Sequence, residues 1–235
     1  VETDLALLPV GSTEQHGPHA PLGTDAIAAE AVAAAGADAA DGEVVVAPAI
    51  PVGVAEEHRH FAGTLWVSED TFRDYVGETI ESLAHHGWDR VVVVNGHGGN
   101  TDALREVCAR LSRDGTAYAV PFTWFDAVDP AEAGLPADAE MGHAGPVETS
   151  LLYHLHPETV HDERLDEAAE GSAERWGEWV SGVNLTYDTD DFSENGAVGD
   201  PRESDPAVGE ALLEQASAAL ADLLAAVEDR DVDAE

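Results

Sequence analysis

The chain has 235 residues, of which 48 are Asp or Glu and 10 are Lys or Arg, so its formal net charge is −38. This balance excludes partners that bind a basic surface, above all nucleic acids and anionic membrane surfaces. The sequence also has no apolar run near the roughly 20 residues that a membrane-spanning helix needs. A hydrophobic share of 44% is that of a globular protein, not of a disordered acidic chain.

The charged residues also predict an environment. The basic residues are all Arg, and the sequence contains no Lys. An acidic surface of this kind suits a very salty solution, where the Debye length is about 3 Å and self-repulsion is screened. We therefore expect a halophilic, cytoplasmic protein. The single cysteine, Cys108, excludes an internal disulfide and fits a reducing compartment. Because Val1 is not Met, we expect residues to be missing before it.

Short apolar runs alternate with amphipathic stretches along the chain. The apolar runs are typical of strands buried on both faces of a parallel sheet, and the amphipathic stretches are typical of helices. Their alternation predicts right-handed crossovers and an open sheet with helices on both sides. We expect strands at 5–10, 44–47, 91–94 and 117–120, and helices at 26–39, 68–86, 101–113, 146–155 and 207–227.

The remaining segments predict loops within a single domain. Residues 127–142 and 182–206 are rich in Gly, Pro, Asp and Glu, so we expect loops there. We assign residues 1–228 to one domain and residues 229–235 to an acidic tail. In open α/β sheets, ligands bind beyond the carboxyl ends of the strands, so we look for a site at that edge.

Carboxylates and imidazoles follow the first and third predicted strands. Glu14 and His16 are two residues apart, so in extended backbone they point to the same side. Asp25 falls near the start of a predicted helix, where we expect it to cap the helix N-terminus. His97 stands among glycines, which let a ligand approach the backbone closely. Two carboxylates and two imidazoles on one rim indicate a pair of divalent metal ions, with Zn, Mn and Fe as candidates.

A metal pair of this kind has a defined chemistry. Two bridged ions about 3.5–4 Å apart share a water molecule, lower its pKa and polarise a carbonyl oxygen. This predicts hydrolysis without a covalent intermediate, in line with a sequence that lacks the G-x-S-x-G motif. Each residue alone is explained as well by packing, by a helix cap or by a surface position. The combination of all four is what favours a metal site.

Five blocks of sequence, in the same order, resemble the creatininase (creatinine amidohydrolase) family between residue 5 and about residue 220. The resemblance implies a three-layer α/β/α fold with a mostly parallel central sheet. It also implies two divalent metal ions, hydrolysis of an amide-type carbon–nitrogen bond, and a homohexamer. The blocks are LPVGSTEQHGPH with GTD at 8–25, EH with FAGTL at 57–65, NGHGGN at 95–100, GHAGPVETS at 142–150, and NG with GDP at 195–201.

The resemblance implies a role for each matching residue. By position, Glu14 and His97 resemble the ligands of one ion. His16 resembles a ligand of the other ion, and Asp25 resembles the bridge between them. His143 resembles the acid–base residue near the scissile nitrogen. An imidazole suits that task because its ordinary pKa of about 6.5 lies near working pH.

The chain departs from creatininase itself at several positions. Creatininase has Tyr-Glu after the motif His, and that Glu is a metal ligand, whereas this chain has Gly98 and Gly99. The second ion then lacks one protein ligand, unless Glu148 or water replaces it. Creatininase has an acid before its catalytic His, where this chain has Gly142, and residues 137–139 do not match its substrate contacts. Creatinine is therefore not the expected substrate.

Several residues keep more than one interpretation. Glu148 is a metal ligand, a partner of a ligating His, or a carboxylate favoured by a helix dipole. His58 lines a substrate pocket or belongs to a solvated loop, and Trp66 narrows the pocket or packs in the core. We also expect Gly98 and Gly99 at the substrate, because they replace side chains there.

The sequence thus predicts a metal-dependent amidohydrolase that acts on a small-molecule amide rather than on a peptide bond. The Gly-Gly form resembles other branches of the family, which include a peptidase of mycofactocin maturation and a formamide hydrolase of archaeal flavin and deazaflavin synthesis. The formamide hydrolase needs an Arg near the metals for its phosphorylated substrate, and only Arg59 is close to a motif. A non-catalytic metal- or ligand-binding protein on the same fold is the alternative from another class, and it has no need of His143.

Overall fold

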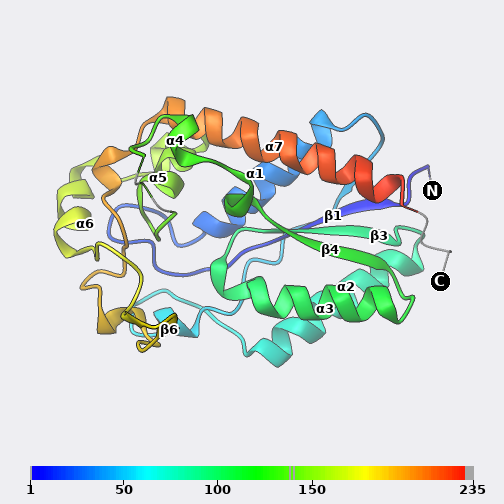
Figure 1. The fold of residues 1–235 in the computed structure, drawn as a ribbon, viewed down its shortest axis with the longest axis horizontal. Helices are drawn as coiled ribbons and strands as arrows, with labels where there is room; N and C mark the ends of the chain where they lie inside the picture. Colours follow the sequence, from blue (N-terminus) through cyan, green and yellow to red (C-terminus); the bar gives the residue numbers. More distant parts are fainter. Residues whose placement is uncertain (1, 138, 140, 231–235) are drawn as a thin grey trace.

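The protein was analysed as a computed structural model, which describes residues 2–137, 139 and 141–230. The predicted acidic tail lies, from residue 231 on, outside the described residues. Figure 1 shows a twisted sheet between two layers of helices, with the last turn of α7 on the same side as the start of β1. No helix in the described part of the chain is long and apolar enough to cross a membrane.

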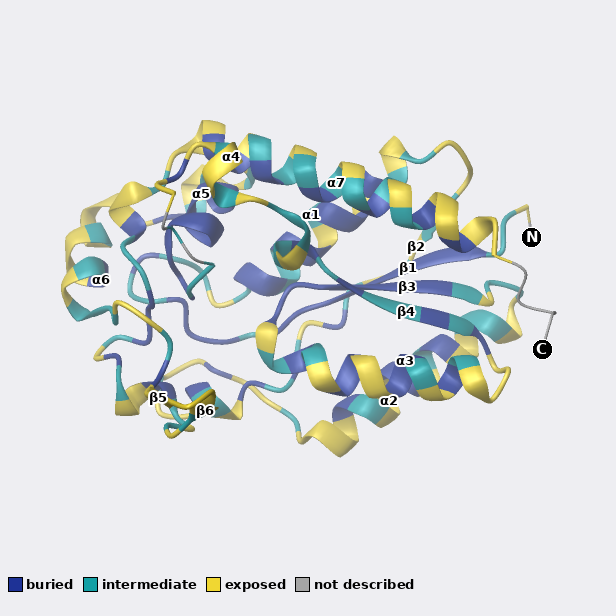
Figure 2. Ribbon diagram, in the orientation of Figure 1, coloured by how far each residue is buried: buried dark blue, intermediate teal, exposed yellow. Residues whose placement is uncertain are grey.

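Four parallel strands form the central sheet in the order β2-β1-β3-β4. Every residue of β1 is buried, as is all of β3 except its first residue, which is why these segments are continuous apolar runs (Figure 2). The prediction of a mostly parallel sheet is confirmed, although the second strand is shorter than predicted. The strands are β1 (Leu5–Val10), β2 (Val45–Val46), β3 (Arg90–Asn95) and β4 (Tyr118–Thr123).

Helices cover both faces of the sheet. Leu5 and Leu7 of β1 pack into an apolar cluster with α1, α5 and α7, whereas Ala6 and Leu8 pack into a second cluster with α2 and α3. Alternate residues of one strand therefore serve two cores, which confirms the predicted three-layer α/β/α fold. The helices are α1 (Thr24–Ala39), α2 (Glu69–His85), α3 (Thr101–Arg113), α5 (Pro146–Leu155) and α7 (Pro206–Glu228).

Short elements appear where the sequence analysis predicted a loop or assigned no helix or strand. The helix α4 (Pro130–Ala133) begins with a proline and is capped by Asp129, whose carboxylate accepts the Ala131 and Glu132 N–H groups. The prediction of a loop throughout 127–142 is therefore wrong at α4. The other short elements are the helix α6 (Leu165–Gly171) and the hairpin of β5 (Trp179–Val180) and β6 (Val183–Asn184), the second strand of which begins inside the predicted loop 182–206.

The crossing of α7 over α5 depends on a glycine. A Cβ added at Gly209 would overlap the carbonyl oxygen of Ser150 on α5. We expect Gly209→Ala to lower the free energy of unfolding by about 1–3 kcal/mol, because the two helices must move apart. Gly77→Ala in α2 is the matched control, since its Cβ would meet only Val107 Cγ2 at 3.4 Å. Denaturant unfolding in high salt measures both, and an equal effect of the two changes would contradict the close crossing.

Candidate metal centre

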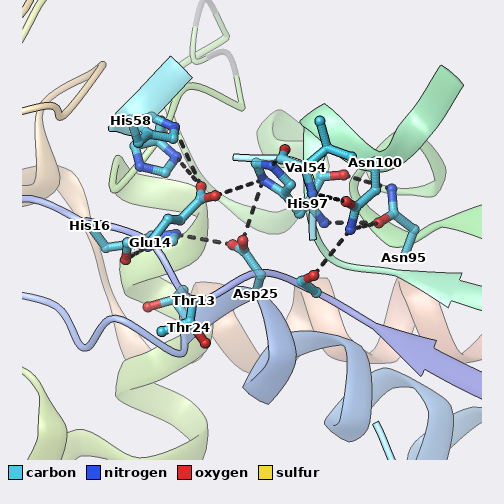
Figure 3. Close-up of polar contacts among 12 residues, drawn as sticks. Thr13, Glu14, His16, Thr24, Asp25, Val54, His58, Asn95, His97 and Asn100 are labelled. Carbon is cyan, nitrogen blue, oxygen red and sulfur yellow. Dashed lines mark hydrogen bonds and ion pairs between the residues drawn. The ribbon is translucent and has the colours of Figure 1, made fainter. Parts of the chain in front are cut away.

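The candidate ligands come from loops at the carboxyl ends of β1 and β3, as the sheet rule predicted. Glu14 and His16 lie in the segment after β1, and His97 lies just after β3. Asp25 is the second residue of α1, and the position before that helix is held by Gly23 without any side-chain cap. The prediction that Asp25 caps the helix is therefore wrong. Its carboxylate instead points into the site, towards both imidazoles (Figure 3).

One group of ligand atoms lies around His97 Nδ1. His97 Nδ1 lies 3.2 Å from Glu14 Oε2 and 3.4 Å from Asp25 Oδ2. Atoms that share one metal ion at about 2.0–2.2 Å lie about 3–3.5 Å from each other. Both distances from His97 Nδ1 therefore fit ligands of one ion.

A second group of ligand atoms shares the same aspartate. His16 Nε2 lies 3.1 Å from Asp25 Oδ1 and 3.7 Å from Glu148 Oε1. The other oxygen of Glu148 accepts the Ala144 N–H at 2.6 Å, which leaves Oε1 facing the site. The two carboxylate oxygens of Asp25 thus face two different sets of ligand atoms.

Backbone carbonyls orient both candidate imidazole ligands. His97 Nε2 lies 2.6 Å from the carbonyl oxygen of Val54, and His16 Nδ1 lies 3.2 Å from that of Glu14. A carbonyl oxygen only accepts, so these two ring nitrogens carry the protons. In the neutral rings, the remaining nitrogens present lone pairs to the carboxylates, which is how metal-binding histidines are held in general.

Several polar atoms of the site are buried and have no hydrogen-bond partner among the described residues. An unpaired buried polar group is costly, and native structures contain few of them. Divalent ions would supply the missing partners, and the donor set of carboxylate and imidazole suits Zn or Mn. These atoms, all on candidate ligands, are both carboxylate oxygens of Glu14, Asp25 Oδ2 and His16 Nε2.

The charges of the site shift its proton equilibria. Burial raises the pKa of the Glu14 carboxyl to about 7, against the opposing effect of His97. Burial acts to lower the pKa of His97, but Glu14 and Asp25 outweigh it and raise that pKa to about 10. The pKa of His16 is likewise raised well above its ordinary value by Asp25 and Glu148, despite burial. Without ions, protons on the imidazoles balance the carboxylates.

Metal loading is therefore expected to release protons. At pH 8 the imidazoles of His97, with a pKa of about 10, and of His16 hold protons on the nitrogens that a metal needs. Loading the apo protein with Zn²⁺ should release about two protons per subunit, and the affinity should rise with pH because fewer protons are displaced. Calorimetric titration in two buffers of different ionisation enthalpy measures this number. A binding enthalpy that does not depend on the buffer would contradict it.

A cavity of about 420 Å³ opens beside these ligands. His143 lines it, and burial together with the neighbouring His16 lowers the pKa of its imidazole to about 4. Its Nε2–H donates to the carbonyl oxygen of Gln15 at 2.7 Å, so the unprotonated Nδ1 faces Glu14 Oε1 at 3.6 Å. The ring also lies within ligand distance of His16 and Glu148, so geometry alone permits His143 to bind a proton or a metal ion.

Three of the four predicted substrate residues line the cavity, and the fourth, Trp66, does not. His58 is buried and lines the cavity with Gly98 and Gly99, so the interpretation of His58 as part of a solvated loop is wrong. Trp66 is 42% exposed and belongs to neither the cavity lining nor the core. On either side of it, the Leu65 and Val67 N–H groups donate to the carbonyl oxygens of Thr13 and Gly53.

Sequence reasoning missed several residues that line the cavity. Phe125 follows the carboxyl end of β4, where the sheet rule indicated a site but the sequence analysis singled out no residue. Trp176 meets the rings of His58 and His143 edge-on at 5.9 and 6.1 Å, from a segment without any motif. The remaining missed lining residues are Glu57, Met141 and Val198.

A model of the creatininase family, described as creatinine amidohydrolase, matches residues 1–224. The chain belongs to the creatininase family. Among curated members, a mycofactocin precursor peptide peptidase of Mycolicibacterium smegmatis is 37% identical over 215 residues, which cover 89% of this chain and 79% of that protein. A creatinine amidohydrolase of Pseudomonas putida is 31% identical over 68% of each chain. A peptidase of the same name from Mycobacterium ulcerans is 40% identical, and the match spans only 61% of its length.

Solved creatininase structures share the fold. A creatininase mutant complexed with creatine is 26% identical, with a TM-score of 0.79 over 96% of this chain and 92% of that one. A creatininase structure with Mn is 25% identical, with a TM-score of 0.78 over 96% and 91%. The predicted family and fold are confirmed, and divalent metal binding is supported. Halophilic origin, cytoplasmic location and the homohexamer stay predictions.

The close packing of His97 and Val54 explains why this creatininase-family chain has a glycine at position 99. A Cβ at Gly99 would lie 2.5 Å from His97 Nε2 and would also overlap the carbonyl oxygen of Val54. That carbonyl accepts the proton of His97 Nε2 and so sets the tautomer of the ring. A side chain at position 99, such as creatininase has by resemblance, therefore requires a different backbone around His97.

Proposed function

We propose that this protein hydrolyses carbon–nitrogen bonds with two divalent metal ions. The observation that carries the proposal is Asp25, whose two carboxylate oxygens lie 3.1 Å from His16 Nε2 and 3.4 Å from His97 Nδ1. One ion would be held by Glu14, Asp25 and His97, and the other by His16, Asp25 and Glu148. Glu148 would then occupy the coordination position that the Gly-Gly form leaves without a ligand.

The side chains of the cavity transfer the proton and limit the access of water. When bound, the ions activate water and polarise the carbonyl group of the substrate. His143 Nδ1 accepts the proton of the attacking water and delivers it to the leaving nitrogen. Because its pKa is lowered to about 4, the ring is neutral and ready to accept a proton at neutral pH. Trp176 covers the rings of His58 and His143 and limits the access of water.

The cavity favours a peptide-like amide over creatinine. Apolar side chains of Phe125, Met141, Trp176 and Val198 line much of the cavity of about 420 Å³. Relatives named as peptide peptidases are 37–40% identical to this chain, against 31% for the creatinine amidohydrolase. We therefore widen the sequence prediction, which left out peptide bonds, to include short peptides with apolar residues.

The two alternative functions have weaker support. Among the described residues that line the cavity, none is Arg, and the sequence has no Lys. Arg59 is instead paired with Asp188 at 2.6 Å outside the cavity, so the described cavity wall offers no guanidinium for the phosphate of a formamide hydrolase's substrate. A binding protein without activity has no use for His143 beside the metal ligands.

The proposal is tested with an amide panel on the metal-loaded protein in high salt. The panel contains creatinine, assayed for the formation of creatine, together with an N-formyl amine and short peptides that end in apolar residues, assayed for amine release. Each assay is run with Zn²⁺ or Mn²⁺. We expect turnover of the peptides and none of creatinine. Metal-loaded protein that is inert across the whole panel would favour the binding protein, and turnover confined to the formyl compound would favour the formamide hydrolase.

A further inference from the structure

Gln15 lies between two candidate ligands in the sequence, but its side chain has no role in the site described so far. The residue is 5% exposed. Its Oε1 accepts the Gly17 N–H at 2.9 Å, and its Nε2 donates to the Gly196 carbonyl oxygen at 2.9 Å. Both partners are backbone groups, one of which only donates and the other only accepts. They therefore fix which end of the amide is oxygen and which is nitrogen.

The second N–H of this amide is directed at His58. Gln15 Nε2 lies 2.9 Å from His58 Nδ1, so this ring nitrogen must accept a hydrogen bond. The neutral ring then carries its proton on Nε2, which lies 3.4 Å from Glu14 Oε1. Thr189 Oγ1 also lies 3.0 Å from His58 Nδ1, but a hydroxyl donates or accepts and so does not choose the tautomer.

The main chain of the same residue acts on the second imidazole. The carbonyl oxygen of Gln15 accepts the His143 Nε2–H at 2.7 Å, which leaves Nδ1 unprotonated 3.6 Å from Glu14 Oε1. The rings of His58 and His143 stack with centroids 4.4 Å apart and planes at 22°. One ring thus turns an N–H, and the other a lone pair, towards the same carboxylate oxygen.

Gly196 provides the space that this arrangement needs. Its φ of +86° lies in the region that favours glycine, and a Cβ there would fall on the amide group of Gln15. A side chain at this position would push the amide away from His58. The Asn-Gly pair at 195–196, one of the sequence blocks, therefore shapes the pocket that holds Gln15.

We propose that Gln15 is a positioning residue that gives His58 and His143 opposite functions at the cavity wall. Its side chain makes His58 a hydrogen-bond donor, and its carbonyl oxygen makes His143 a proton acceptor. Glu14, His58 and His143 lie within ligand distance of each other, but a protonated Nε2 cannot coordinate a metal. His58 is therefore no metal ligand, and its N–H is available to Glu14 or to the substrate's oxygen. The catalytic meaning of this assignment rests on the proposed function.

The tautomers can be measured directly by NMR on metal-loaded protein labelled with ¹⁵N-histidine. Two-bond proton–nitrogen spectra identify the protonated nitrogen of each ring, and His58→Gln and His143→Gln assign the signals. We expect Nε2–H tautomers for both rings in the wild type. In Gln15→Glu the carboxylate only accepts, so His58 should change to Nδ1–H, while His143 should stay unchanged because its partner is the main chain.

Thr189→Val is the matched control, and the wild-type spectrum alone can already contradict the proposal. Thr189→Val removes the hydroxyl from the same ring nitrogen but leaves the amide, so His58 should keep its Nε2–H form. An Nδ1–H form of His58 in the wild type would overturn the proposal even if Gln15→Glu did not fold. An Nε2–H form that persists in Gln15→Glu would overturn it as well.

Activity gives a second, separate readout. We expect kcat of Gln15→Glu to fall about 10–100-fold with unchanged metal content, the size typical of changes to groups that orient a metal site. The NMR result requires no turnover. A protein that shows the expected tautomers but hydrolyses no amide would leave the assignment of Gln15 intact and refute the proposed function.

Discussion

Asp25→Asn is expected to abolish turnover and to reduce the bound metal to one ion per subunit or less. Asn keeps the shape of the side chain, but its amide nitrogen cannot coordinate a metal. Only one of the two ligand sets, the one at His16 or the one at His97, therefore keeps an oxygen from position 25. We expect activity to fall by more than about 100-fold, because changes even to groups outside the ligand set cost about 10–100-fold. Elemental analysis after gel filtration, with amine release, measures both.

Asp102→Asn is the matched control for this change. Asp102 is also the second residue of a helix, α3, but its side chain is 99% exposed and contacts only Arg105 at 3.6 Å. The same chemical change at the same helix position should leave metal content and turnover unaltered. Full metal content in Asp25→Asn would show that Asp25 is not the shared ligand, and the assignment of Asp25 as the bridge between the two ions would have to be given up.

The parts of the fold that depend on local pattern could be predicted from the sequence. The runs that became β1 and β3 were identified because strands buried on both faces are apolar at every position. The helix α6 and the hairpin of β5 and β6 were missed. They are too short for hydrophobic periodicity to distinguish them from loops. Segments of this length are held by their tertiary contacts rather than by their own propensity.

The residues of the candidate site also fall into those that local pattern predicts and those that it does not. The sheet rule and the motifs located Glu14, His16 and His97, because their positions follow from where strands end. The orientation of Asp25 followed only from the family resemblance and not from the local pattern, since a carboxylate in a first helical turn caps or faces outward equally well. Contacts between distant segments, such as Trp176 on His143, leave no trace in local spacing. They become visible only when the chain is folded.

His143→Gln is expected to lower kcat by about 10²–10⁴-fold while the metal content stays unchanged, because it removes a proton acceptor and no ligand. The amide of the new Gln can still donate to the carbonyl oxygen of Gln15, so the loop should keep its structure. With its pKa lowered to about 4, His143 is unprotonated above that pH, and wild-type activity should fall as the pH drops through it. With the ions kept saturating at every pH, the pH profile of the variant should lack this acid limb.

Metal analysis of the same variant separates the two roles that geometry permits for His143. The ring lies within ligand distance of His16 and Glu148, so a metal ligand would lose its ion on substitution, whereas an acid–base residue would not. His156→Gln, at a half-exposed ring beside Glu158, serves as the control for the chemical change itself. If His143→Gln lost one ion together with its activity, His143 would become a fourth ligand of the ion at His16, and the proton transfer would need another residue.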